Sequence, residues 1–225
     1  MIRVIIISFY IVFGTGSIIE DLSATTKKTG TVSENAYQFL LRLEELVQLN
    51  DCATALLKIN SNKYKNKYKI TKIIIENFAL GSSKSLGELN HSKESSSSTF
   101  KNINEKSKHF EKKKLFFNIK GKYFEKTYKV PIDTLDNYIR EKKILKIDFL
   151  KIDTEGYEYE VLNGLKNNFD KVKMIFLEHH YDNMIEKGYK FADINNLLIK
   201  NNFIKIFKCK MPFRKTFEYL YQNRL

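Results

Sequence analysis

The feature that decides the fold is the stretch of residues 148–164, which reads DFLKIDTEGYEYEVLNG. Its first part is a short apolar run of strand-forming residues, and it ends in two acids, Asp153 and Glu155. Gly156 then marks a turn, after which apolar residues recur at helical spacing. In open α/β sheets, ligands bind outside the carboxyl ends of the strands. The stretch therefore predicts a strand, an acidic tip and a helix, with a functional site at the tip.

Strand and helix patterns alternate along much of the chain. We expect strands at residues 4–13, 31–33, 70–78, 148–153 and 173–177, and helices at 18–28, 36–49, 135–139 and 191–198. A hairpin is expected within 116–129, and residues 203–207 and 217–221 predict a closing antiparallel pair. Strands that alternate with helices indicate βαβ units and a mainly parallel sheet, which makes this an α/β protein.

Length and composition favour a single domain over residues 1–225. A chain of 225 residues with 43% hydrophobic residues is sufficient for one α/β domain with a sizeable core. A polar segment at about residues 82–112 interrupts the pattern, and it is rich in Ser, Lys, Asn and Glu. This insertion is interpreted either as a flexible surface segment or as a lid over a substrate.

The net charge of +13 leaves nucleic acid, an anionic membrane or an acidic substrate open as partners. Lysines are spread along the chain and no nucleic-acid-binding motif accompanies them, so we expect no nucleic-acid partner. Two distant cysteines, Cys52 and Cys209, indicate a reducing, cytoplasmic location. The apolar run at residues 4–13 is shorter than the ~20 residues of a membrane span. The run favours a first buried strand, with a signal peptide as the alternative, and no stable membrane insertion is expected.

The stretch at residues 148–164 resembles the FkbM family of methyltransferases, whose mark is a leucine–aspartate pair before a KIDxEGxExxVLxG run. The pair is Leu135 and Asp136, and further matches lie at residues 79–81 and 175–178. The run matches at Lys151, Ile152, Asp153, Glu155, Gly156, Glu158, Val161, Leu162 and Gly164. The resemblance implies a Rossmann-like, doubly wound sheet of the class I methyltransferase type, with about seven strands and an antiparallel final strand. It also implies S-adenosylmethionine as the methyl donor.

The donor site is expected at the N-terminal end of the chain. Gly14 and Gly16 follow the first expected strand, where backbone without a Cβ can approach a ligand closely. Glu34 lies at the tip of the second expected strand, and its carboxylate is suited to two vicinal ribose hydroxyls. This turn departs from the family pattern, because Val12 stands where the family has an aspartate. A catalytically inactive, methyltransferase-like binding protein therefore stays open as the alternative.

The reacting groups are expected at the tips of two neighbouring strands. Asp153 and Glu155 follow one strand, and Glu178 and His179 follow the next, with either His179 or His180 able to titrate near neutral pH. Methyl transfer to a hydroxyl needs both reactants to be positioned and a proton to be accepted. The acceptor is expected to be a hydroxyl of a sugar, a glycan or a secondary metabolite. No residue set indicates a metal site, although clustered carboxylates and a histidine could bind a divalent ion.

Overall fold

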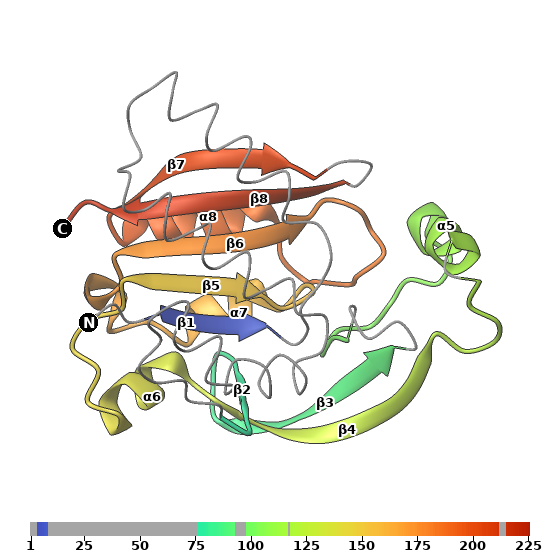
Figure 1. Ribbon diagram of the computed structural model, residues 1–225, viewed down its shortest axis with the longest axis horizontal. Helices are drawn as coiled ribbons and strands as arrows, with labels where there is room; N and C mark the ends of the chain where they lie inside the picture. Colours follow the sequence, from blue (N-terminus) through green and yellow to red (C-terminus); the bar gives the residue numbers. More distant parts are fainter. Residues whose placement is uncertain (1–3, 9–75, 93–97, 117, 212–214) are drawn as a thin grey trace, which may run out of the picture. The chain divides into compact units, whose positions relative to one another are not determined.

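A five-stranded mixed sheet forms the centre of the computed structural model, which describes residues 4–8, 76–92, 98–116, 118–211 and 215–225. The strand order is β1 (Val4–Ser8), β5 (Phe149–Asp153), β6 (Met174–His180), β8 (Thr216–Asn223) and β7 (Phe203–Lys210). The strands β1, β5 and β6 are parallel, whereas β8 runs antiparallel to both β6 and β7 (Figure 1). The predicted strands at 148–153 and 173–177 and the closing antiparallel pair are confirmed.

The chain divides into two units, Met1–Tyr10 with Asn77–Leu225 and Ile11–Glu76, and the elements described here belong to the first. The expected strand at residues 4–13 is confirmed for β1, while residues 9–13 lie outside the described residues. The elements expected between residues 18 and 49 also lie outside them. Of the strand expected at 70–78, only residues 76–78 are described; they contain no strand, and strand β2 follows at Ala79–Leu80.

A second, three-stranded sheet has the order β2, β4 (Phe124–Asp133) and β3 (Ser85–Ser92). The pairs β2–β4 and β3–β4 are parallel and antiparallel, respectively. The predicted hairpin within 116–129 is therefore wrong, because β4 pairs with a strand inside the segment that we interpreted as a polar insertion. That segment also contains most of helix α5 (Lys108–Phe116). Only Ser92 of β3 is buried and the other residues are exposed or half-buried, so the strand has a polar composition that concealed it in the sequence.

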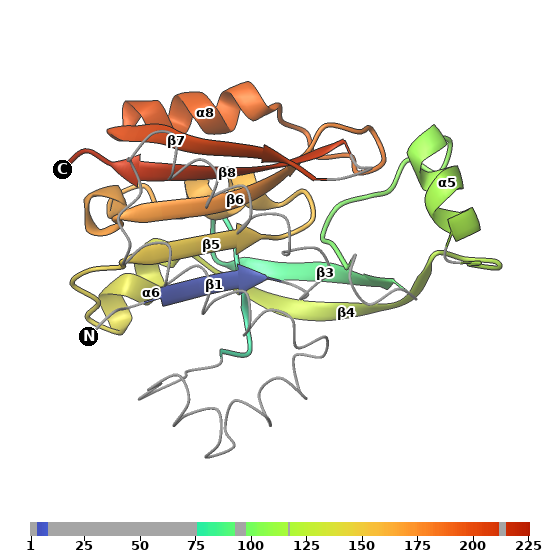
Figure 2. The same cartoon turned by 45° about the horizontal axis from the view of Figure 1, so that its top comes forward.

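Helices α7 (Glu158–Asn163) and α8 (Phe191–Lys200) contribute to the main core on one face of the five-stranded sheet. Leu150 of β5 and Leu177 of β6 pack in one buried cluster with Ile194 and Leu198 of α8. Figure 2 shows α8 running along the sheet beside β7 and β8. Side chains alternate between the two faces of a strand. The residues between these core positions, including Lys151 and Glu178, therefore point to the opposite face.

The mixed α/β architecture is confirmed, with two sheets and both parallel and antiparallel pairs. The expected helices at 135–139 and 191–198 correspond to α6 (Leu135–Glu141) and α8. A short 3₁₀ helix, η2 (Phe169–Lys171), precedes β6. Seven strands in one doubly wound sheet are not observed in the part of the chain that the structure describes.

Three segments that carry the family-like motifs, around Gly81, Asp136 and Gly164, lie against one another. A Cβ built on Gly164, which follows α7, would lie 2.1 Å from the carbonyl oxygen of Gly81. The backbone N–H of Asp136 donates to the Gly164 carbonyl over 2.9 Å. The Asp136 carboxylate accepts from the backbone and side chain of Asn167 and from the side chain of Asn168. Gly81, Asp136 and Gly164 therefore hold three separate segments together, which is a structural role.

Replacement of Gly164 by alanine is expected to destabilise the fold by about 3 kcal/mol, because backbone must move to admit a Cβ. Chemical denaturation gives the free energy of unfolding of the variant. Lys166→Ala, at an exposed position two residues further along, is the control and should change that free energy by less than about 0.5 kcal/mol. Equal stability of the two variants would contradict the close approach of Gly81 and Gly164.

Candidate active site at the carboxyl ends of β5 and β6

Strand periodicity brings acids from two neighbouring strands to one face of the sheet. Asp153 is the last residue of β5, and Glu178 and His180 lie in the last three residues of β6. Because β5 and β6 are parallel, their carboxyl ends meet at the same edge. The sequence predicted that Glu178 directly follows the strand. In the structure Glu178 is part of β6, but it still lies at this edge of the sheet.

The loop after β5 is held by the buried carboxylate of Glu158. Its Oε1 accepts from the backbone N–H groups of Thr154 (3.3 Å) and Gly156 (2.9 Å) and from the Thr154 hydroxyl (3.2 Å). Its Oε2 accepts from the hydroxyl of Tyr189. Burial and the Glu158 charge raise the pKa of Tyr189, so its phenol stays a donor. These bonds satisfy a side chain that is only 1% exposed.

Two consecutive residues of this loop have left-handed backbone. Glu155 has φ of 47° and Gly156 has φ of 91°. A Cβ on Gly156 would also lie 2.6 Å from the Ile185 side chain, so glycine is required there for two reasons. For a non-glycine residue such as Glu155, this conformation is uncommon and needs support from the surrounding structure. The turn directs the Glu155 side chain back toward the end of β6.

Asp153, Glu155, Glu178 and His180 form what we call the acid cluster. The Nε2 of His180 lies 3.4 Å from Glu155 Oε2 and 3.2 Å from Glu178 Oε1. The other ring nitrogen, Nδ1, lies 3.1 Å from the Thr216 hydroxyl of β8. Asp153 pairs with Lys151 at 3.2 Å. The cluster thus combines three carboxylates with one imidazole between two of them.

Burial makes two of these acids, Asp153 and Glu155, weaker than usual, and repulsion from neighbouring carboxylates adds to the effect. Burial raises the pKa of Glu155 to about 7, against the opposing charges of His180 and Lys113. Burial likewise raises the pKa of Asp153 to about 6, with Lys151 opposing the change and Glu178 adding to it. Burial alone would lower the pKa of His180, but Glu155 and Glu178 raise it to about 10. At neutral pH the imidazole is therefore charged, while Glu155 exchanges protons readily.

His179, which the sequence suggested as a reacting group, lies on the opposite face of β6. Its ring is 2% exposed and packs against Tyr181 and Phe191 with centroid distances of 4.8 and 5.4 Å. Burial lowers the pKa of His179 to about 4, so the ring is neutral. The structure brings Asp153, Glu155 and Glu178 together with His180 instead. The sequence left both His179 and His180 open, and strand alternation counted from Glu178 is the signal that favours His180.

The residues expected to hold the donor, Gly14, Gly16 and Glu34, lie outside the described residues. Within the described residues, no group of three or more His, Cys, Asp or Glu side chains is arranged to hold a metal ion. Likewise, none of the helices described is long and apolar enough to cross a membrane.

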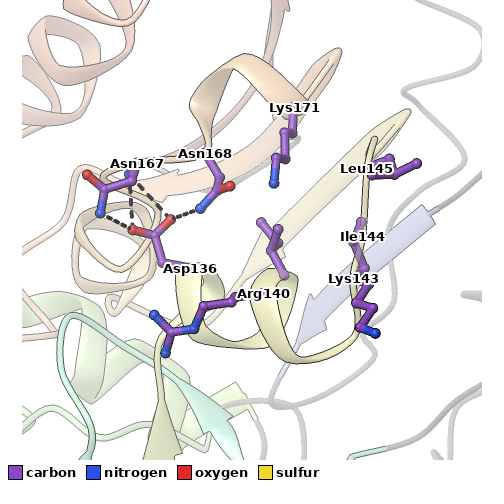
Figure 3. A pocket seen from close by; sticks show the side chains of 9 residues that line it. Asp136, Arg140, Lys143, Ile144, Leu145, Asn167, Asn168 and Lys171 are labelled. Atoms are coloured by element: carbon purple, nitrogen blue, oxygen red, sulfur yellow. Dashed lines mark hydrogen bonds between the residues drawn. The ribbon is translucent and has the colours of Figure 1, made fainter.

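A separate open pocket of about 450 Å³ lies at the other end of the strands, before β5 and β6 begin. Its lining comes from α6, the loop after it and the region of η2: Asp136, Ile139, Arg140, Lys143, Ile144, Leu145, Asn167, Asn168 and Lys171 (Figure 3). In this view the Asp136 carboxylate is bound by Asn167 and Asn168. The pocket shares no residue with the acid cluster, so we do not assign it to the reacting centre.

Comparison with known protein families gives one finding. The family model described as the methyltransferase FkbM domain matches residues 34–205, which include strands β5 and β6. No curated protein and no solved structure matches the chain.

His180 is expected to make the free energy of unfolding depend on pH. Its pKa is about 10 when folded against 6.5 for the free side chain, so its stabilising contribution is complete below pH 6.5 and is lost as the pH rises through 10. Denaturation at a series of pH values should show this decline in the wild type and a flatter profile in His180→Gln. His179→Phe should keep the wild-type slope, because His179 stays neutral throughout this range. An unchanged slope in His180→Gln would contradict the ion pairing described above.

Proposed function

This chain belongs to the FkbM methyltransferase family, and we propose that it transfers a methyl group from S-adenosylmethionine to a hydroxyl group. Its family membership supports methyl transfer in general. Family membership also supports S-adenosylmethionine as the donor, and the choice of a hydroxyl as acceptor rests on the chemistry of the acid cluster. We also propose that the complete sheet has the seven-stranded class I arrangement. The few cysteines support a reducing, cytoplasmic location.

One observation carries the proposal, namely that Glu155 combines a pKa of about 7 with a position at the carboxyl end of the central strands. A general base is most effective when its pKa lies near the working pH. Ordinary glutamates have a pKa of 4.5 and would hold an abstracted proton weakly. Burial of Glu155 in the cluster therefore suits it to accept the proton of an attacking hydroxyl.

The charge of the cluster fits the donor. Three carboxylates face the His180 imidazolium and the Lys151 ammonium, so the cluster keeps at most one net negative charge, which attracts a sulfonium cation weakly at short range. When bound, S-adenosylmethionine would supply an activated methyl group for in-line displacement. Gly14, Gly16 and Glu34 remain the residues that we propose to hold it.

Each member of the cluster then has a task. Glu155 accepts the hydroxyl proton, and Asp153 and Glu178 orient the acceptor by taking hydrogen bonds from neighbouring hydroxyls. The His180 imidazolium opposes the rise in the pKa of Glu155, which keeps a useful fraction of that carboxylate ionised at neutral pH. Vicinal hydroxyls are typical of sugars, so a sugar, a glycan or a hydroxylated secondary metabolite is the proposed acceptor.

Isothermal titration with S-adenosylmethionine and with its demethylated product is the first test. One-to-one binding of both is expected, and Glu34→Gln should weaken it because two ribose hydroxyls would lose a charged acceptor. A folded chain that binds neither compound would favour the alternative, an inactive protein with a methyltransferase-like fold.

Glu155→Gln is expected to lower the transfer rate by about 10²–10⁴-fold, the usual contribution of a general base. Donor binding should fall by a much smaller factor, because the amide keeps the size and shape of Glu155 and removes only one of the carboxylates of the cluster. Transfer is measured with a radiolabelled methyl donor and a panel of hydroxylated acceptors. Glu125→Gln, at an exposed position of β4, is the matched control and should transfer at the wild-type rate. Wild-type turnover by Glu155→Gln would exclude Glu155 as the base.

A further inference from the structure

The segment of residues 98–107, which we call the strap, contacts the loop after β5, which carries Glu155, and the loop after β6. On one side, the backbone of Thr99 exchanges two hydrogen bonds with Asn90 of β3, at 2.9 and 3.1 Å. On the other side, the Glu186 N–H donates to the Asn102 carbonyl over 3.0 Å, and the Asn104 N–H donates to the Met184 carbonyl over 2.8 Å. The strap is therefore fastened both to β3 and to the loop that follows β6.

Between these attachments, the strap contacts the backbone of Glu155 directly. The Thr99 hydroxyl donates to the Glu155 carbonyl oxygen over 2.8 Å, and Thr99 has no exposed surface. The same hydroxyl oxygen accepts from the N–H of Lys101 over 3.0 Å. The Thr99 hydroxyl thus accepts one hydrogen bond from Lys101 and uses its own proton to donate to the Glu155 carbonyl. A buried bond of this kind is costly to leave unmade.

The conformation of Glu155 explains why such a bond matters. With φ of 47°, Glu155 has a backbone that non-glycine residues rarely adopt. Glu158 holds the N–H of Gly156, which follows Glu155, and Thr99 holds the Glu155 carbonyl. The two bonds fix the two ends of the same peptide group. The direction of the Glu155 side chain toward His180, at 3.4 Å, follows from that fixed peptide group.

We propose that Thr99 is a positioning residue, which acts through its hydroxyl on the Glu155 carbonyl and thereby holds the Glu155 carboxylate against His180. The inference rests on the proposed function, in which Glu155 is the base. The strap lies outside the sequence motifs, yet through Thr99 it sets the position of the Glu155 carboxylate.

The pKa of the His180 imidazole reports this geometry without a donor or an acceptor. His180 faces Glu155, Glu178 and Asp182, at 3.4, 3.2 and 3.9 Å, and Glu155 is the largest of the charges that raise its pKa. The chain has four histidines, so two-dimensional NMR of histidine-labelled protein should resolve each ring. The signal of His180 is assigned by its loss in His180→Gln.

In Thr99→Val, which keeps the shape and removes the hydroxyl, the pKa of His180 should fall toward its ordinary value of 6.5. Glu155→Gln gives the size of the fall when the carboxylate is lost altogether. Thr99→Ser keeps the hydroxyl and should retain the wild-type pKa. Should Thr99→Val not fold, Thr99→Ala takes its place with the same expectation.

Lys101→Met is the matched control within the strap. It removes the ion pair of Lys101 with Glu160 but leaves the Thr99 hydroxyl in place, so the pKa of His180 should stay at the wild-type value. A wild-type pKa in folded Thr99→Val would overturn the inference, and so would an equal fall in Lys101→Met or Thr99→Ser. If Glu155→Gln keeps full transfer while Thr99→Val still lowers the pKa of His180, the base assignment fails and the positioning contact stands.

Discussion

The structure of the site depends on the buried carboxylate of Glu158. Three donors from Thr154 and Gly156 and the hydroxyl of Tyr189 converge on this one side chain. A buried charge without such partners would cost several kcal/mol, so the loop is confined to the shape that supplies them. That shape requires left-handed backbone at two positions, and the left-handed turn presents Glu155 to the end of β6.

Structural and chemical roles are divided among the residues of the sequence pattern. Gly81 and Gly164 meet at backbone distance, and Asp136 ties α6 to the segment that follows α7. These residues hold the frame and do not contact the acid cluster. Asp153 and Glu155, in contrast, have buried carboxylates whose pKa values are raised, which is typical of reacting groups. Some residues of the sequence pattern therefore stabilise the fold, and others supply the side chains of the acid cluster.

Electrostatics in the cluster depend on which face of β6 a residue occupies. His179 and His180 are neighbours in sequence, yet burial among aromatic rings lowers the pKa of His179, while carboxylates raise that of His180. The result is a charged imidazole beside Glu155 and a neutral one in the aromatic packing on the other face. The cation in turn limits the rise in the pKa of Glu155, which couples the two side chains.

The sequence by itself determined the strands β5 and β6, the closing pair β7 and β8, and the presence of acids at the strand ends. These features are local, because hydrophobic alternation and turn residues specify them within about ten residues. Only the tertiary structure decided that β4 pairs with β3 and that Thr99 contacts Glu155, which lies 56 positions away. Such long-range contacts depend on how separate segments pack, and no short-range pattern of residues encodes that packing.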